Sequence, residues 1–263
     1  MYSAEHKRFV RKRRFRSILV HLFQFILIVG FILLWEMLAK YEIINTFISS
    51  SPSRIVNTIV KLYNDGNLFN HIWTTIYETL ISFGIGTLIG ILAATALWYF
   101  NFLYRVLDPY LTIINSLPKV AIGPIIIIYF GANIKSIIIM ALLISVIVTV
   151  ITVYNGFVST DQNRINLLKS FKASRCQMFR YVILPSSYPT IISSLKINIS
   201  MTLIGVIMGE FLVSKEGIGY LITYGSQVFN LNLVMSGIVI LLIVSYLMYL
   251  IVGYIEKILI KAD

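Results

Sequence analysis

The sequence predicts an all-α integral membrane protein with six transmembrane helices and a two-helix loop between the fourth and fifth spans. Of the 263 residues, 58% are hydrophobic and only 13% are charged, whereas about 25% of residues are charged in ordinary soluble domains. The apolar residues gather in six windows that are each long enough to cross a bilayer, and the basic residues gather between alternate windows. A chain of this composition lacks the polar surface that a water-soluble domain needs.

The six windows supply the proposed spans. A helix of about 20 mostly apolar residues crosses the ~30 Å hydrocarbon layer. The first window begins directly after a basic segment but is too long for a signal peptide, and no small-residue cleavage site follows it, so we expect a retained span. Gly84, Gly86 and Gly90 are expected to let helices approach closely. The windows cover residues 18–39, 73–98, 106–130, 134–157, 188–213 and 233–255.

The basic residues predict the orientation. Seven of them lie within residues 7–16, and others gather in the loop 158–187 and near the C-terminus. Lysine and arginine are enriched in cytoplasmic segments, so both termini are expected in the cytoplasm. The predicted organisation is a basic cytoplasmic N-terminus (1–17), a transmembrane domain (18–255) that contains the loop 158–187, and a cytoplasmic tail (256–263).

Several function classes are unsupported. The net charge of +11 comes largely from the N-terminal cluster, which is typical of a topology signal rather than of nucleic-acid binding. One cysteine and three scattered histidines give no metal-ligand spacing, and no phosphate-binding Gly-x-x-x-x-Gly-Lys-Ser/Thr motif occurs. No nucleophile–base set suggests an intramembrane enzyme. We therefore expect no catalytic residue, metal site or ATP site in this chain.

The loop 158–187 is expected to contain two short amphipathic helices. Ser159 with Gln162, and Ser174 with Gln177, have the spacing of capping boxes, and Pro185 is expected to end the second helix. Basic residues occupy the polar sides. Such helices either lie on an anionic membrane surface or dock on a partner protein. The apolar faces comprise Ile165, Leu168 and Phe171 in the first helix, and Met178, Phe179, Val182 and Ile183 in the second.

The segment "NLLKSFKASRCQMFRYVILPSSYP" resembles the Glu-Ala-Ala (EAA) loop of ABC-importer permeases. The similarity extends over about residues 30–255, where "LDPYLTIINSLPKVAIGPIIIIYFG" and "MGEFLVSKEGIGYLI" resemble permeases of the nitrate, sulfonate and taurine importers. In the loop, the match rests on Ala173, Ser174, Arg175, Gln177, Phe179, Val182, Leu184 and Pro185.

This resemblance implies the type I ABC importer permease fold in a bacterial inner membrane. The implied partners are a second copy of the chain, two ATPase subunits that bind ATP and Mg²⁺, and an extracytoplasmic substrate-binding protein. The loop would dock on the ATPase, with Arg175 and Arg180 steering the encounter. The chain departs from the family at Asn166–Leu168, which stand where Glu-Ala-Ala is usual, and at Lys172, which stands where glycine is usual. Either the backbone at Lys172 differs from the family's, or the docking angle does.

Charged residues at membrane depth are costly and need an explanation. Lys119 lies between Pro118 and Pro124, where a weakened helix exposes carbonyl groups. It either faces the solute pathway, together with Asn115 and Pro118, or pairs with an acid such as Glu78. Glu210 either lines the pathway or makes a contact between helices. A lysine in the pathway is compatible with a small anionic solute such as a sulfonate, taurine or nitrate.

The main hypothesis is therefore a permease subunit of an ATP-driven importer. The alternative is a self-sufficient secondary transporter or channel. The absence of an internal repeat, an expected lack of paired buried acids and the two-helix loop count against this alternative.

Overall fold

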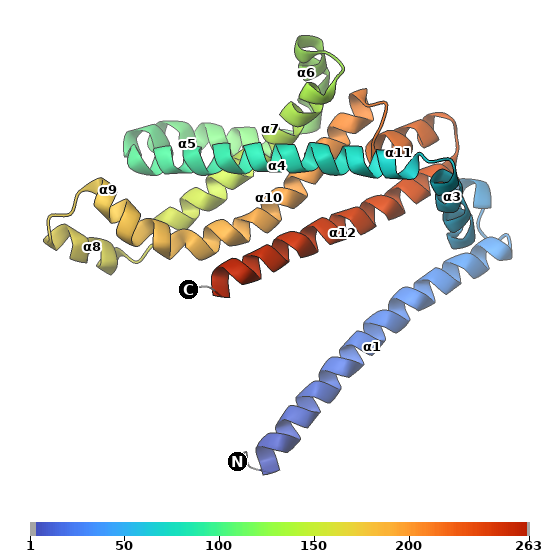
Figure 1. Cartoon of the computed structure of the whole chain (residues 1–263), viewed down its shortest axis with the longest axis horizontal. Coiled ribbons are helices and arrows are strands. Elements are labelled where there is room, and N and C mark those ends of the chain that lie inside the picture. Colours follow the sequence, from blue (N-terminus) through green and yellow to red (C-terminus); the bar gives the residue numbers. More distant parts are fainter. Residues whose placement is uncertain (1–3, 262–263) are drawn as a thin grey trace.

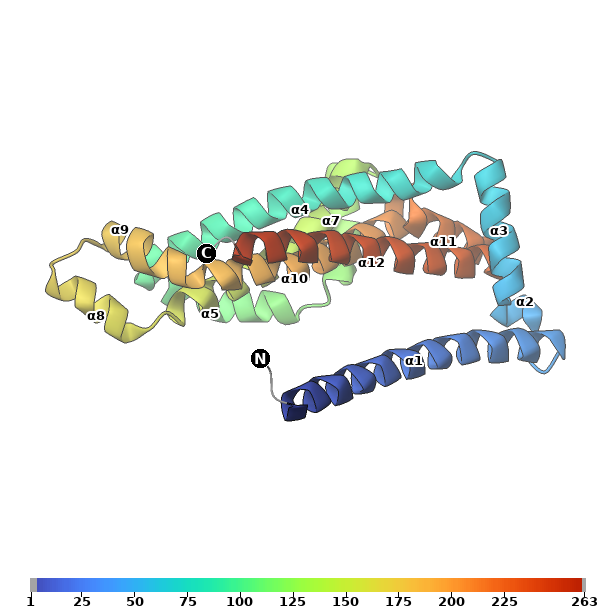
Figure 2. The ribbon, with the colours of Figure 1, turned by 60° about the horizontal axis from the view of Figure 1, so that its bottom comes forward.

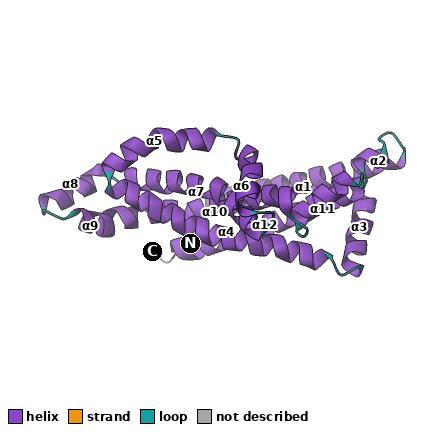
Figure 3. Cartoon of the chain, turned by 90° about the horizontal axis from the view of Figure 1, so that it is seen from above, coloured by secondary structure: helices purple, strands orange, loops and turns teal. Residues whose placement is uncertain are grey.

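The computed structural model describes residues 4–261, which form helices joined by short turns, with no strand in that range (Figure 3). Five helices within the described residues are long and apolar enough to span a membrane, and a bent helix pair raises the number to six if it counts as one span. The elements are α1 (Ala4–Lys40), α2 (Thr46–Ser49), α3 (Pro52–Asn64), α4 (Leu68–Tyr99), α5 (Asn101–Ser116), a 3-10 turn η1 (Lys119–Ile122), α6 (Gly123–Phe130), α7 (Ile134–Val158), α8 (Gln162–Ser170), α9 (Arg175–Met178), a π-helical turn η2 (Phe179–Ile183), α10 (Leu184–Val213), α11 (Ile218–Gln227) and α12 (Leu231–Lys261).

The centre of the bundle is α7 packed between α4 and α10 (Figure 1). Small residues permit the close approach: a Cβ on Gly90 would lie 2.6 Å from Thr149, and one on Gly205 would lie 2.5 Å from the Ala141 backbone. Gly86 likewise faces Ser145. The expectation of tight glycine packing is therefore confirmed for Gly86 and Gly90, whereas Gly84 faces open space.

The third predicted span is broken. α5 ends at Ser116, and the η1–α6 segment leaves at 90° to it. Pro118 cannot donate a backbone hydrogen bond, and Pro124 occupies the first turn of α6, so the chain restarts rather than continues. The prediction that Pro118 and Pro124 weaken the helix is confirmed. A prediction of one straight helix over residues 106–130 would be wrong, because the chain bends there.

The helix α1 stands away from the bundle (Figure 2). Its apolar stretch, Phe15–Lys40, is almost entirely exposed, and Ala39 is the one residue of the stretch that is buried. Near its end, Glu36 accepts hydrogen bonds from the Ser53 backbone N–H (3.0 Å) and hydroxyl (2.8 Å) at the start of α3. α3 begins at Pro52, with Ser51 as its cap.

Candidate functional site

The first candidate site is the α8–α9 loop, residues 159–187, which projects at one end of the bundle (Figure 1). Asp161 caps α8 by accepting a hydrogen bond from the Asn163 N–H at 2.9 Å. The expected Ser159–Gln162 capping box is wrong, because Ser159 instead closes α7 and donates its hydroxyl to the Gly156 carbonyl. An aspartate at the N-cap position accepts a hydrogen bond from a free N–H group in the first turn as well as a serine does.

The turn after α8 reverses the chain through a Schellman motif. The N–H of Lys172 donates to the Lys169 carbonyl (2.9 Å), and the N–H of Ala173 donates to the Leu168 carbonyl (3.1 Å). Lys172 has φ +58°, the left-handed conformation that glycine adopts most readily at this position. The turn therefore has the left-handed backbone although a lysine, and not a glycine, occupies this position, and the lysine is strained there.

The second half of the loop begins with the Ser174–Gln177 capping box, in which both reciprocal hydrogen bonds are present. Pro185 does not end the helix that follows. The π-helical turn η2 widens the chain just before it, and Pro185 lies in the first turn of α10, where its missing N–H needs no partner. The loop thus runs directly into α10, in one stretch from Arg175 to Val213.

The loop is fastened to the bundle by Phe179. Its ring centroid lies 5.1 Å from that of Trp98 on α4 and 5.3 Å from that of Phe157 on α7, the latter edge-on. Arg175 adds a hydrogen bond from its guanidinium to the Tyr99 carbonyl at the end of α4 (3.0 Å), where a cation also complements the helix dipole. Ile165 packs against the same apolar cluster. A displacement of the loop therefore acts directly on α4 and α7.

The outer surface of the loop is apolar and basic. Phe171 is 74% exposed and Leu167 is 58% exposed, one helical turn apart, and Lys169 and Lys172 are exposed beside them. The predicted apolar face is only partly correct: Phe171 is exposed, whereas Ile165 and Leu168 are half-buried. Leu167 was missed, although its i, i+4 spacing to Phe171 indicates a shared face. The other predicted loop residues divide into Ala173, Met178 and Phe179, which are half-buried, and Ser174, Arg175, Gln177, Arg180, Leu184 and Pro185, which are exposed.

The second candidate site is the break between α5 and η1. Lys119 Nζ donates to the Asn115 carbonyl at 2.9 Å and lies 3.4 Å from Asn115 Oδ1. The lysine thus satisfies a carbonyl group that the broken helix leaves free. Asn115 and Pro118 are exposed on the surface of this single chain. The alternative pairing of Lys119 with Glu78 is wrong, because Glu78 instead contacts Glu210.

Glu210 lies elsewhere, between α10, α4 and the turn before α11. It is 1% exposed and accepts hydrogen bonds from the Thr75 hydroxyl (2.6 Å) and the Gly219 N–H (2.5 Å). The same turn is held by the Ile218 N–H, which donates to Thr75 Oγ1 at 2.8 Å. Glu210 and Lys119 thus have different hydrogen-bond partners, Thr75 and Gly219 for the glutamate and Asn115 for the lysine.

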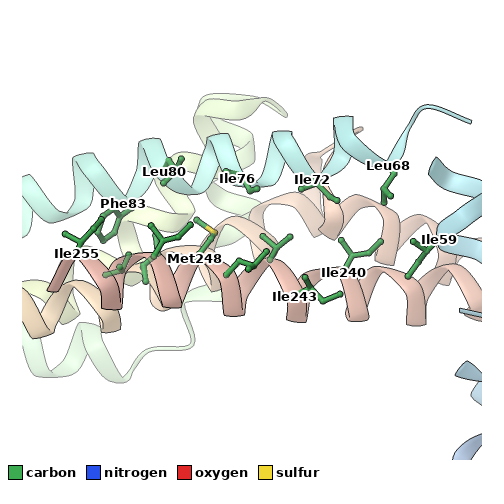
Figure 4. Close-up of a pocket in the computed structure, with 15 residues that line it drawn as sticks. Ile59, Leu68, Ile72, Ile76, Leu80, Phe83, Ile240, Ile243, Met248 and Ile255 are labelled. Carbon is green, nitrogen blue, oxygen red and sulfur yellow. The ribbon is translucent and has the colours of Figure 1, made fainter. Parts of the chain in front are cut away.

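A third feature is an apolar groove of about 530 Å³ between α4 and α12 (Figure 4). Leu80, Phe83, Met248 and Ile255 are among its lining residues, all of which are hydrophobic. The groove offers no side-chain donor or charge, so it does not fit a polar solute.

Comparison with known proteins supplies the class. Residues 86–261 match the family described as the binding-protein-dependent transport system inner membrane component, and the chain belongs to this family. A probable ABC transporter permease protein of Haemophilus influenzae is 30% identical over 88% of this chain and 94% of its own length. A putative aliphatic sulfonates transport permease protein of Bacillus subtilis is 28% identical, over 88% of this chain and 83% of its own length.

Solved structures agree on the fold. A bacterial ABC transporter involved in the import of alginate superposes with a TM-score of 0.65 at 14% identity, over 97% of this chain and 99% of the other. An inward-facing methionine ABC transporter gives a TM-score of 0.63 at 19% identity, over 72% of this chain and 94% of the other. The molecule is a multi-pass permease subunit of an ABC importer, a transport component rather than an enzyme. This answers the question left open between such a subunit and a self-sufficient transporter.

Proposed function

We propose that two copies of this chain form the pore of an ABC importer, and that the α8–α9 loop of each copy docks on a cytoplasmic ATPase subunit. ATP and Mg²⁺ bind the ATPase subunits, and an extracytoplasmic binding protein delivers the solute. The clustering of basic residues at the N-terminus and in the loop supports an orientation with both termini and the loop in the cytoplasm.

The observation that carries the docking proposal is the exposed pair Leu167 and Phe171 on a loop that is otherwise tied to the bundle. Two large apolar side chains at the tip of a polar, basic loop are typical of the centre of a protein interface. Lys169 and Lys172 beside them favour an acidic rim on the partner. A membrane-surface role needs a continuous apolar face along both helices, whereas here Phe179 and Ile165 turn inward.

Coupling follows from how the loop is anchored. Motion of the docked loop is transmitted through Phe179 to Trp98 on α4 and Phe157 on α7, and through Arg175 to the end of α4. ATP-driven closure of the two ATPase subunits would draw the loops together and favour the outward-open state over the inward-open state. Such coupling requires that the two states differ in how the loops are placed.

The proposed solute is small and anionic, such as a sulfonate, taurine or nitrate. Lys119 supports this assignment, because it carries a positive charge at the break in the third span, where Asn115 and Pro118 are also exposed. The Bacillus subtilis relative bears the name of an aliphatic sulfonates permease. We propose that Asn115, Pro118 and Lys119 face the pathway when the second copy is present.

The docking proposal is tested by co-purifying the ATPase encoded beside this chain with the wild type and with Phe171→Asp. A charge placed in the apolar contact is expected to abolish retention of the ATPase. The control is Phe229→Asp, since Phe229 is equally exposed (73%) but lies in the turn before α12, at the other end of the bundle. Retention of the ATPase by Phe171→Asp, or its loss from both variants, contradicts the proposal.

The substrate proposal is tested separately, by uptake of taurine and of an alkanesulfonate into vesicles that contain the complete importer. Lys119→Ala is expected to lower uptake at least tenfold, and Lys119→Arg to preserve most of it. Lys135→Ala, which removes an exposed lysine at the start of α7, serves as the control. Unchanged anion uptake in Lys119→Ala would remove the support for an anionic solute and leave the docking proposal intact.

A further inference from the structure

Two glutamates from different helices meet inside the bundle, where the transport mechanism above gives them no role. Glu78 on α4 is 3% exposed and Glu210 on α10 is 1% exposed. Thr75, which precedes Glu78 by one turn of α4, donates its hydroxyl to Glu210 at 2.6 Å, and this contact places the two carboxyl groups beside one another. Both glutamates are almost fully buried within helices that are long and apolar enough to span a membrane, so water screens their interaction only weakly.

The two carboxyl groups differ in the number of hydrogen bonds that they accept. Both oxygens of Glu210 accept a donor, one from Thr75 and the other from the Gly219 N–H. In contrast, Oε2 of Glu78 is buried and has no donor among the described residues. A buried carboxylate is tolerable where N–H and O–H groups point at it, and costly where they do not. Glu210 is therefore the member suited to carry the negative charge, and Glu78 is suited to be neutral.

No basic side chain compensates the pair. The groups that contact Glu210 are Thr75, Gly219, Tyr220 through its backbone, and Glu78, while the charged neighbour of Glu78 is Glu210. Lysine and arginine are missing from these contacts in the part of the chain that the structure describes. Two ionised carboxylates in contact repel one another strongly in a low-dielectric site.

The surrounding titratable groups belong to α4, the 214–217 turn and α11. On α4, His71 accepts a hydrogen bond from the Gly217 N–H at its Nδ1 atom (3.0 Å), and its ring lies 5.8 Å from that of Tyr220 on α11. Lys215 and Glu216 lie in the turn and are exposed. From α7, the apolar Ile137 packs against α10 beside Gly209. Among the described residues, His71 and Tyr220 are thus the neighbours that can confuse a titration, and of these His71 can be tested by itself.

We propose that Glu78 and Glu210 form a proton-binding site, in which one proton, carried by Glu78, is shared with the ionised Glu210 and fastens α4 to the α10–α11 turn. The proton comes from water and returns to water, with no other bond made or broken. Its removal places two negative charges in contact and pushes the 217–219 backbone away from α4. The turn has little room to adjust otherwise, since a Cβ on Gly217 or Gly219 would lie within 2.8 Å of Glu210.

The first test is the pH dependence of thermal unfolding for the full chain in detergent. The wild type is expected to lose several degrees in Tm as the pH rises from mildly acidic to alkaline, because the unfolded chain gives up this proton at a lower pH than the folded chain does. Glu78→Gln is expected to be insensitive over that range, because its amide donates to Glu210 without titrating. His71→Asn, which keeps an acceptor for Gly217, and Glu42→Gln, which removes an exposed acid, are both expected to keep the wild-type slope. Equal slopes in the wild type and Glu78→Gln would overturn the proposal.

The second test is the infrared carbonyl band of a protonated carboxyl group, recorded in D₂O at neutral pD. The wild type is expected to show this band and Glu78→Gln to lack it. If Glu78→Gln does not fold, the band in the wild type decides: its presence at neutral pD and loss at alkaline pD supports the site, and its absence at neutral pD overturns it. Stabilisation of the wild type, but not of Glu78→Gln, by Na⁺ or K⁺ at constant pH would assign the site to a metal cation and equally overturn the shared proton.

Discussion

The two ends of α10 are built in opposite ways. At its first end, the helix continues from the α8–α9 loop, where Phe171 and Leu167 are exposed and the turn contains a strained lysine. At its last end, Glu210 is buried and every contact of the following turn is made within the chain: Gly219 to Glu210, Ile218 to Thr75 and Gly217 to His71. One end leaves large apolar side chains exposed, and the other pairs its polar groups within the chain.

This difference shows how the two ends of α10 can have different roles, the loop end in transmitting motion and the turn end in stabilising the bundle. The loop end exposes apolar surface, and in the proposed complex this surface becomes buried when the ATPase binds, so that the free energy of binding is available for coupling. At the turn end, the polar groups form hydrogen bonds within the chain that hold α4, α10 and α11 together. Substitutions at the turn end should therefore change the stability of the chain, and those at the loop tip should change binding to the ATPase.

The largest effect is expected at the turn end, from Gly217→Ala. Gly217 has φ +107°, and a Cβ there would lie 2.4 Å from the Glu210 carboxyl carbon. Backbone strain and overpacking together are expected to cost ~2–4 kcal/mol of unfolding free energy, measured as a lower Tm in detergent. Gly66→Ala is the control, because Gly66 has φ +74° but faces open space and should lose only about 1 kcal/mol. Equal losses at both positions would show that the contact with Glu210 is unimportant.

A smaller loss of stability is expected when the loop is detached from the bundle by Phe179→Ala. The substitution removes the ring that contacts both Trp98 and Phe157 and should cost ~2–3 kcal/mol, since the ring is only half-buried. Phe171→Ala should leave the Tm of the isolated chain nearly unchanged, because that ring is 74% exposed. If Phe171→Ala destabilises the isolated chain as much as Phe179→Ala does, the loop tip packs within the chain and is not a free docking surface.

The smallest effect is expected from Lys172→Gly. Glycine adopts the left-handed conformation without steric cost, so the Schellman turn should become more stable by ~1 kcal/mol. The measurement is amide hydrogen exchange at Ala173, whose N–H bonds to Leu168. Slower exchange is expected, and Lys169→Gly, which weakens the last turn of α8 instead, should give faster exchange. Slower exchange in neither or in both variants would contradict the strain assigned to Lys172.

The sequence predicts the membrane helices well because each depends on its own composition. The break at Pro118 and the start of α3 at Pro52 follow in the same way, since proline acts locally through its missing N–H. The Ser174 cap was equally readable, whereas Asp161 replaced Ser159 because two acceptors stand close together at the start of α8 and only the backbone decides between them.

Contacts between distant helices could not be read from the sequence. Phe179 and Phe171 have similar positions in their amphipathic patterns, yet one packs inward on Trp98 and the other is exposed. The meeting of Glu78 with Glu210 joins residues far apart in the chain, so the expected lack of paired buried acids is wrong. Pro185 was predicted to end a helix. This prediction is wrong because a π-helical turn, which has no sequence signature of its own, carries the helix past the proline.

The most direct test of the docking account uses Cys176, the chain's one cysteine, which lies exposed on α9. Its rate of labelling by a maleimide should fall at least tenfold when the partner ATPase is bound. A cysteine introduced at Phe229 in a Cys176→Ser background should label at the same rate with and without the ATPase. Unchanged labelling of Cys176 in a complex shown to contain stoichiometric ATPase would contradict docking through the α8–α9 loop.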